Sequence, residues 1–166
     1  MKLAKSLDRL GTETAFSVLA EAKKLEATGK PMIHLGLGQP DFKTPKHIVE
    51  AAKKALDDGH HGYVLSNGIL ECRQSVTRKI KKLYNQDIDP ERIIIMPGGK
   101  PTMSYAIQCF GEPGVEIIHP TPAFPIYESM INFTGAKAVP YDLTEDKDLK
   151  FNPEKILSLI TDKTRL

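Results

Sequence analysis

The sequence predicts an α/β fold in which parallel strands alternate with helices. Short apolar segments of strand length alternate with longer segments whose apolar residues recur every three or four positions, and glycine or proline separates the two kinds. The clearest unit is a strand over 92–96, a helix over 101–110 and a strand over 115–119, followed by a further strand over 137–141. A strand, a helix and a strand in such close succession predict a right-handed βαβ unit with parallel strands.

The remaining elements follow from signals that start and stop helices. Gly29 ends a first helix, and Thr44 can cap a second helix that has Pro45 at its first position. Asn152 can cap the last helix in the same way. The expected elements are helices over 16–28, 46–58, 69–83, 125–133 and 153–160 and a short strand over 32–35.

The predicted sheet is incomplete. Parallel sheets are covered on both faces, and the strands over 92–96, 115–119 and 137–141 are too few to build such a sheet. Residues 161–166 resemble the loop out of a helix and the first residue of another strand. We therefore expect a piece of a larger fold in which the apolar face of 93–96 is partly uncovered. On its own, such a piece is expected to aggregate or to stay partly disordered.

Composition and charge exclude several functions. The 166 residues are 40% hydrophobic and 27% charged, with a formal net charge of +2, so no nucleic-acid or membrane footprint is indicated. Cys72 and Cys109 have no CxxC spacing and are expected to be buried thiols in a reducing compartment. His60 and His61 have no partner at metal-ligand spacing, so no metal site is expected. No apolar run suits a signal peptide or a membrane span, and a cytoplasmic protein is expected.

The turn Gly98-Gly99-Lys100 is a candidate binding site for an anion. It leads from an apolar strand into a helix expected to begin at Pro101, and backbone N–H groups converge at such a helix start. Two glycines let a phosphate approach without a Cβ clash, and Thr102 could donate its hydroxyl to a phosphate oxygen. An ordinary tight turn has the same residues. Lys100 is expected to face solvent or the phosphate charge rather than to act as a covalent catalyst.

Two aromatic residues complete the candidates. Phe124 lies between Pro122 and Pro125 and is either a core residue or a platform on which a planar ring stacks. Tyr63 lies in a polar turn with a hydroxyl that can donate, and it is either a surface residue or a ligand-binding one. A phosphate cradle followed by an aromatic platform suits a phosphorylated, planar, aromatic cofactor.

The order and spacing of these motifs resemble those of the fold-type-I aminotransferases, the class I/II, aspartate-aminotransferase-like family. The motifs are Gly36-Leu37-Gly38-Gln39-Pro40-Asp41-Phe42, Thr44-Pro45, Tyr63 before Gly68, Glu71 with Arg73, Gly98-Gly99-Lys100 and Pro122 to Tyr127. The resemblance runs from about Met32 to Leu166. It implies an incomplete fold-type-I large domain, of the class that depends on pyridoxal phosphate, with an N-terminal helical arm. Residues 1–45 would form the arm and part of a small domain, and 46–166 the first part of the cofactor-binding large domain.

The resemblance implies a role for five residues. Gly99 and Lys100 match the pair whose backbone holds the phosphate of pyridoxal 5′-phosphate, and Phe124 matches the aromatic residue stacked on the pyridine ring. Tyr63 matches a tyrosine that reaches the other subunit's phosphate, which implies a homodimer. Gly38 matches the glycine whose N–H meets the substrate α-carboxylate. The implied reaction moves an amino group between an L-amino acid and a 2-oxo acid.

The family's other cofactor residues are expected after Leu166. They are an asparagine near the cofactor hydroxyl, an aspartate paired with the pyridinium nitrogen, the Schiff-base lysine and a carboxylate-binding arginine. No catalytic residue is therefore expected in this chain, and the 166 residues alone are predicted to be inactive. Two alternatives remain open: another pyridoxal-phosphate chemistry, such as a lyase, on the same scaffold, or a non-catalytic binding, vestigial or partner module.

Overall fold

The computed structural model describes residues 2–11, 14–36, 38–144 and 149–166. The chain divides into two compact units. The first unit combines Met1–Leu37 with Gly98–Leu166, and the second unit is Gly38–Pro97.

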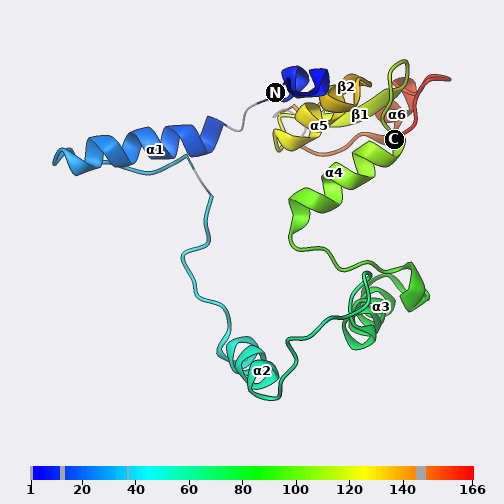
Figure 1. Cartoon of the computed structure of the whole chain (residues 1–166). Helices are drawn as coiled ribbons and strands as arrows, with labels where there is room; N and C mark the ends of the chain where they lie inside the picture. Colours follow the sequence, from blue (N-terminus) through cyan, green and yellow to red (C-terminus); the bar gives the residue numbers. More distant parts are fainter. Residues whose placement is uncertain (1, 12–13, 37, 145–148) are drawn as a thin grey trace. The chain divides into compact units, whose positions relative to one another are not determined.

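The first unit contains a small parallel sheet with helices packed on it (Figure 1). Its elements are η1 (Lys5–Arg9), α1 (Thr14–Ala27), α4 (Gly99–Phe110), β1 (Glu116–Thr121), α5 (Ile126–Thr134), β2 (Lys137–Asp142) and α6 (Pro153–Ser158). β1 and β2 pair in parallel with Ile118 opposite Val139, and α5 connects them. The structure is therefore α/β, as predicted. Among the described residues the βαβ unit is β1–α5–β2, and the unit predicted from 92–96, 101–110 and 115–119 is wrong, because 92–96 is not a strand.

The last residues of the chain run beside β1 on the edge that faces away from β2. The N–H of Glu116 donates to the carbonyl of Lys163 at 2.9 Å, and the N–H of Ile118 donates to the carbonyl of Leu166 at 2.9 Å. Glu116 also forms a parallel bridge with Thr164. These residues form an isolated bridge and no assigned strand, at the place where the start of another strand was expected.

Pro140 lies in the middle of β2. The N–H of Lys137 donates to the carbonyl of Val115 at 2.9 Å, and the N–H of Leu143 donates to the carbonyl of Thr121 at 2.8 Å. Because backbone groups alternate in direction along a strand, the odd-numbered residues of β2 face β1 and the ring nitrogen of Pro140 faces the outer edge. No hydrogen bond between the two strands is lost at Pro140.

The hydrophobic core of the first unit lies between the sheet and helices α4 and α5. Ile131 of α5 is 0% exposed and Ile117 of β1 is 2% exposed. The buried cluster consists of Ile107, Val115, Ile117, Ile131 and Ala136. These residues come from both helices and from the sheet, so burying them fixes α4 and α5 against β1.

Glu116 joins three segments of the first unit through one carboxylate. Its Oε1 accepts a hydrogen bond from Lys137 Nζ at 2.8 Å, and its Oε2 accepts one from Thr161 Oγ1 at 2.8 Å. These hydrogen bonds, the one from Lys137 first, hold the pKa of Glu116 below its ordinary value of 4.5.

We expect Glu116 to make the first unit less stable in acid. Because the folded-state pKa is the lower one, the stabilisation is complete above about pH 4.5 and is lost as the pH falls through the folded-state pKa. An NMR titration of the side-chain carboxyl should place its midpoint below 4.5. The Glu116→Gln variant should lose stability at neutral pH and much less in acid, whereas Glu154→Gln, at an exposed position of α6, should show no such difference. A titration midpoint of 4.5 or higher for Glu116 would contradict the stabilising role of these hydrogen bonds.

A buried arginine holds α3 (Leu70–Tyr84) and η2 (Pro90–Arg92) together in the second unit. The elements of this unit are α2 (Lys46–Asp57), α3 and η2. Arg73 is 2% exposed, and its guanidinium donates to the carbonyls of Gly68 at 3.1 Å and Pro90 at 3.0 Å and to Glu91 Oε1 at 2.7 Å. Gly68 has a φ of +95°, and a Cβ there would lie 2.8 Å from Cγ1 of Ile95. Arg73 therefore ties the turn before α3 to η2, and only glycine fits at position 68.

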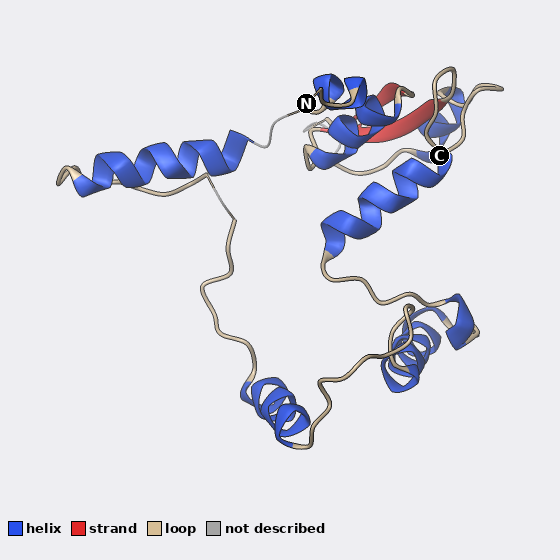
Figure 2. Cartoon of the chain, in the orientation of Figure 1, coloured by secondary structure: helices blue, strands red, loops and turns tan. Residues whose placement is uncertain are grey.

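Two strand predictions are wrong. Residues 32–35 and 92–96 are not strands in the described part of the chain (Figure 2). Extended residues form a strand only beside a partner, and the described residues supply none for either segment. Ile94 is 65% exposed and Ile95 is 37% exposed, so the apolar face of 93–96 is partly uncovered, as expected.

Smaller predictions about helix ends and cysteines also need correction. Pro45 rather than Thr44 is the N-cap residue of α2, and no side chain caps that helix start. Helix α4 begins at Gly99, so Pro101 is its third residue instead of its first. Cys109 is exposed and Cys72 is partly buried, because the described elements cover neither thiol completely.

Candidate functional site

Helix α4 begins at the glycine turn that the sequence predicted as an anion site. Gly98 is its N-cap residue, with φ 101° and ψ 167°, a conformation that is open to glycine alone. Nothing lies within 4 Å of the place where a Cβ of Gly98 would stand. Backbone N–H groups in the first turn of a helix point along its axis rather than to helix carbonyls. The turn therefore offers open space at a positive helix end, which fits a phosphate.

Thr102 turns its hydroxyl back towards the same turn. Its Oγ1 donates to the carbonyl of Gly98 at 3.4 Å, which is a long hydrogen bond. This contact braces the carbonyl of the N-cap residue. The proposed hydrogen bond from Thr102 to a phosphate stays a prediction.

Lys100 lies between two aromatic rings. Its Nζ is 5.4 Å from the ring centroid of Phe124 and 5.2 Å from that of Phe16. Both distances are within the ~6 Å over which an aromatic face attracts a cation. Phe124 is 39% exposed and lies outside the buried cluster, so it is not a core residue. The side chain of Lys100, the second residue of α4, thus reaches the partly exposed ring of Phe124 within the first unit.

The other two predicted residues lie in the second unit. Tyr63 is fully exposed and lines a pocket with His60, Ile69 and Glu71. Gly38 is the first residue of this unit, and nothing lies within 4 Å of the place where its Cβ would stand. The structure therefore brings together Gly99, Lys100 and Phe124, but neither Tyr63 nor Gly38 belongs to their unit.

Phe16 is a neighbour of the candidate site that the sequence did not single out. It was predicted only as an apolar residue on one face of the first helix. Its contact with Lys100 joins α1 to α4, and periodicity within one helix carries no signal for such a contact.

Two other kinds of site have no support within the described ranges. No group of three or more histidine, cysteine, aspartate or glutamate side chains could hold a metal ion among residues 2–11, 14–36, 38–144 and 149–166. Over these same residues, no helix combines the length and apolar character needed to cross a membrane.

Comparison with known proteins assigns the chain to a family. Residues 30–166 match the family Aminotransferase class I and II, and the chain belongs to this family. It is 36% identical over 165 residues to the aspartate aminotransferase of Bacillus subtilis, covering 99% of this chain and 42% of that protein. It is 37% identical over 163 residues to the (5-formylfuran-3-yl)methyl phosphate transaminase of Methanocaldococcus jannaschii, covering 98% of this chain and 42% of that protein.

A solved structure gives the same family and fold. The aspartate aminotransferase of Thermus thermophilus with maleate matches with a TM-score of 0.90 at 29% identity, covering 99% of this chain and 43% of that chain. The chain thus spans about 42% of the length of the curated relatives named here. The resemblance to fold-type-I aminotransferases and the incomplete large-domain fold are confirmed, and this family uses pyridoxal phosphate.

Proposed function

We propose that this chain supplies the phosphate- and ring-binding part of an aminotransferase that moves an amino group between an L-amino acid and a 2-oxo acid. The observation that carries the proposal is the position of Lys100 Nζ, 5.4 Å from the ring centroid of Phe124. It shows that a side chain from the first turn of α4 reaches the ring of Phe124, which is 39% exposed. The open turn at Gly98 suits the phosphate of pyridoxal 5′-phosphate, and the ring of Phe124 suits its flat heteroaromatic ring.

Each predicted residue has a distinct task in this proposal. Gly99 and Lys100 bind the phosphate through the backbone at the start of α4, and Phe124 packs against one face of the ring and excludes water from it. Gly38 donates its N–H to the substrate α-carboxylate. Tyr63 donates its hydroxyl to the phosphate in the other subunit of a homodimer. When bound, pyridoxal phosphate supplies an electron sink for the substrate α-carbon.

We further propose that the 166 residues alone do not catalyse transamination. None of the residues matched to the family is the lysine that anchors the cofactor or the aspartate that pairs with its ring nitrogen. Residues 1–45 would form the arm and part of a small domain, and 46–166 the first part of the large domain, in a cytoplasmic enzyme. Its amino-acid and 2-oxo-acid substrates would be small molecules.

Binding of pyridoxamine 5′-phosphate tests the proposed site. This ligand has no aldehyde, so it cannot form imines with surface lysines. We expect the chain to bind it and Phe124→Ala to weaken binding about tenfold, since stacking on an aromatic side chain contributes ~1–3 kcal/mol. Phe110→Ala, which removes a 49% exposed ring from the other end of α4, is the matched control and should bind as the wild type does.

Two results would contradict the proposal in different ways. If the Phe124→Ala variant and the wild type bound pyridoxamine 5′-phosphate equally well, Phe124 would not be the platform for the cofactor ring. Turnover of amino acid and 2-oxo acid by the 166-residue chain with pyridoxal phosphate would contradict its inactivity. A transamination assay on the purified chain, with and without the cofactor, measures this turnover.

A further inference from the structure

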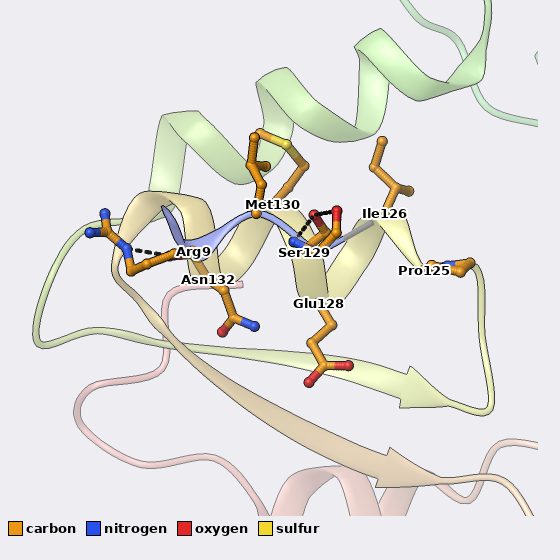
Figure 3. Close-up of a pocket in the computed structure, with 9 residues that line it drawn as sticks. Arg9, Pro125, Ile126, Glu128, Ser129, Met130 and Asn132 are labelled. Carbon is orange, nitrogen blue, oxygen red and sulfur yellow. Dashed lines mark hydrogen bonds between the residues drawn. The ribbon is translucent and has the colours of Figure 1, made fainter. Parts of the chain in front are cut away.

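Residues 5–11, which are the part of the N-terminal arm meant by the word arm from here on, are fastened to the end of α5. Arg9 Nε donates to the carbonyl of Asn132 at 2.8 Å, and Arg9 Nη2 donates to the carbonyl of Phe133 at 2.7 Å. Figure 3 shows Arg9 beside this last part of the helix. The last carbonyls of a helix have no partner within the helix, and a cation complements their partial negative charge. Arg9 therefore caps α5 from a segment far away in the sequence.

Ser129 fastens the arm to α5 one turn earlier. The N–H of Gly11 donates to Ser129 Oγ at 3.0 Å, and the same Oγ donates to the carbonyl of Gly11 at 3.2 Å. One hydroxyl thus serves as acceptor and donor for the same residue. A Cβ at Gly11 would lie 3.4 Å from Ser129 Cβ, so the backbone of the arm touches the helix.

Ser129 also connects to the loop that carries Phe124. The N–H of Ser129 donates to the carbonyl of Pro125 at 3.2 Å, and the N–H of Tyr127 donates to the carbonyl of Phe124 at 3.2 Å. Ser129 therefore bonds to the arm through its side chain and to the residue after Phe124 through its backbone. A single helical turn therefore connects the arm to the residues beside Phe124.

Phe16 of α1 makes a separate contact with the candidate site. The ring of Phe16 lies 5.2 Å from Lys100 Nζ. Lys100 Nζ in turn lies 5.4 Å from the ring of Phe124. Residues in the first part of the chain thus contact α5, through Arg9 and Gly11, and the start of α4, through Phe16.

We propose that the N-terminal arm is a positioning element for the cofactor ring, and that Ser129 and Arg9 are its positioning residues. They hold α5 so that the loop before it presents Phe124 beside the start of α4. This inference rests on the proposed function, because Phe124 serves as a ring platform only if the cofactor binds there. If the arm only covered α5, losing its contacts would leave the presentation of Phe124 unchanged.

The test compares two ligands on the wild type and on Ser129→Ala. We expect the variant to bind pyridoxamine 5′-phosphate about three- to tenfold more weakly, which is the range for lost hydrogen bonds. Its affinity for inorganic phosphate, measured by phosphorus NMR, should stay unchanged, since that ion needs only the α4 turn. Ser158→Ala is the matched control, because that hydroxyl donates only to the carbonyl of Lys155 in its own helix, at 2.7 Å, among the contacts described.

A second variant and a ligand-free measurement keep the test decisive. Arg9→Ala, which removes the two hydrogen bonds from the arm to the end of α5, should act in the same direction as Ser129→Ala. Hydrogen exchange of the amides over 122–128 should be faster in both variants than in the wild type. Unchanged exchange over 122–128, or equal weakening of both ligands, would overturn the inference. If the wild type does not bind pyridoxamine 5′-phosphate, the proposed function fails, and exchange over 122–128 still decides whether the arm holds this loop.

Discussion

Replacing Ile131 with alanine is expected to lower the free energy of opening of the first unit by about 2–5 kcal/mol. Ile131 is 0% exposed and packs in the cluster that joins α5 to Ile107 of α4 and to Ile117 of β1. Shortening its side chain removes apolar contacts and leaves a cavity that the sheet cannot fill. The cost includes both the lost burial and the cavity, so it exceeds the cost of a surface change.

Hydrogen exchange of the β1 and β2 amides measures this effect. Protection in Ile131→Ala should fall at least about 30-fold, which corresponds to the lower end of the range for such substitutions. Ile33→Ala is the matched control, since Ile33 is in the same unit and is 86% exposed. It should change the free energy by no more than about 0.5 kcal/mol. Full protection in Ile131→Ala would mean that this cluster does not hold the unit together.

Replacing Gly98 with alanine should strongly impair binding of both phosphate ligands. The φ of 101° forces an alanine into a conformation that costs about 1–3 kcal/mol. The turn is expected to relax by rotating its backbone, which moves the N–H groups at the start of α4. We therefore expect affinity for pyridoxamine 5′-phosphate and for inorganic phosphate to fall about tenfold or more.

Gly114 provides a control with the same kind of strain at another place. Its φ is +95°, and, as at Gly98, nothing lies within 4 Å of an added Cβ. Gly114→Ala should therefore reduce stability by a similar amount and leave both affinities unchanged, as calorimetric titration and hydrogen exchange can show. Equal loss of affinity in the two variants would mean that strain alone, and not the turn at α4, accounts for the effect.

Local signals predicted the helices and part of the sheet. The amphipathic pattern over 69–83 and the observed α3 at Leu70–Tyr84 agree within a residue at each end. The predicted strand over 137–141 and the observed β2 at Lys137–Asp142 also agree. These elements depend on propensity, capping and periodicity, which short windows of sequence contain.

Features that depend on distant partners could not be predicted in this way. The segment over 92–96 is apolar enough for a strand, but a strand also needs a neighbour, and the described chain supplies none. The turn at Gly98 and the ring of Phe124 were found from glycine and proline patterns. The contacts that Lys100 makes with Phe16 and Phe124, and those that Arg9 makes with α5, join segments far apart in the sequence, so no local pattern predicts them.

Because of Pro140, the two edges of the sheet differ in their ability to pair with a further strand. An extended peptide that approached the outer edge of β2 would meet no N–H donor at the centre of that strand, so a continuous ladder could not form there. The residues beside β1, from Lys163 to Leu166, show that the opposite edge accepts a neighbour. A further strand, from this polypeptide or from another, is thus expected to pair with the edge of β1 rather than with the outer edge of β2. Among the described residues, Pro140 therefore disfavours strand pairing at the outer edge of β2.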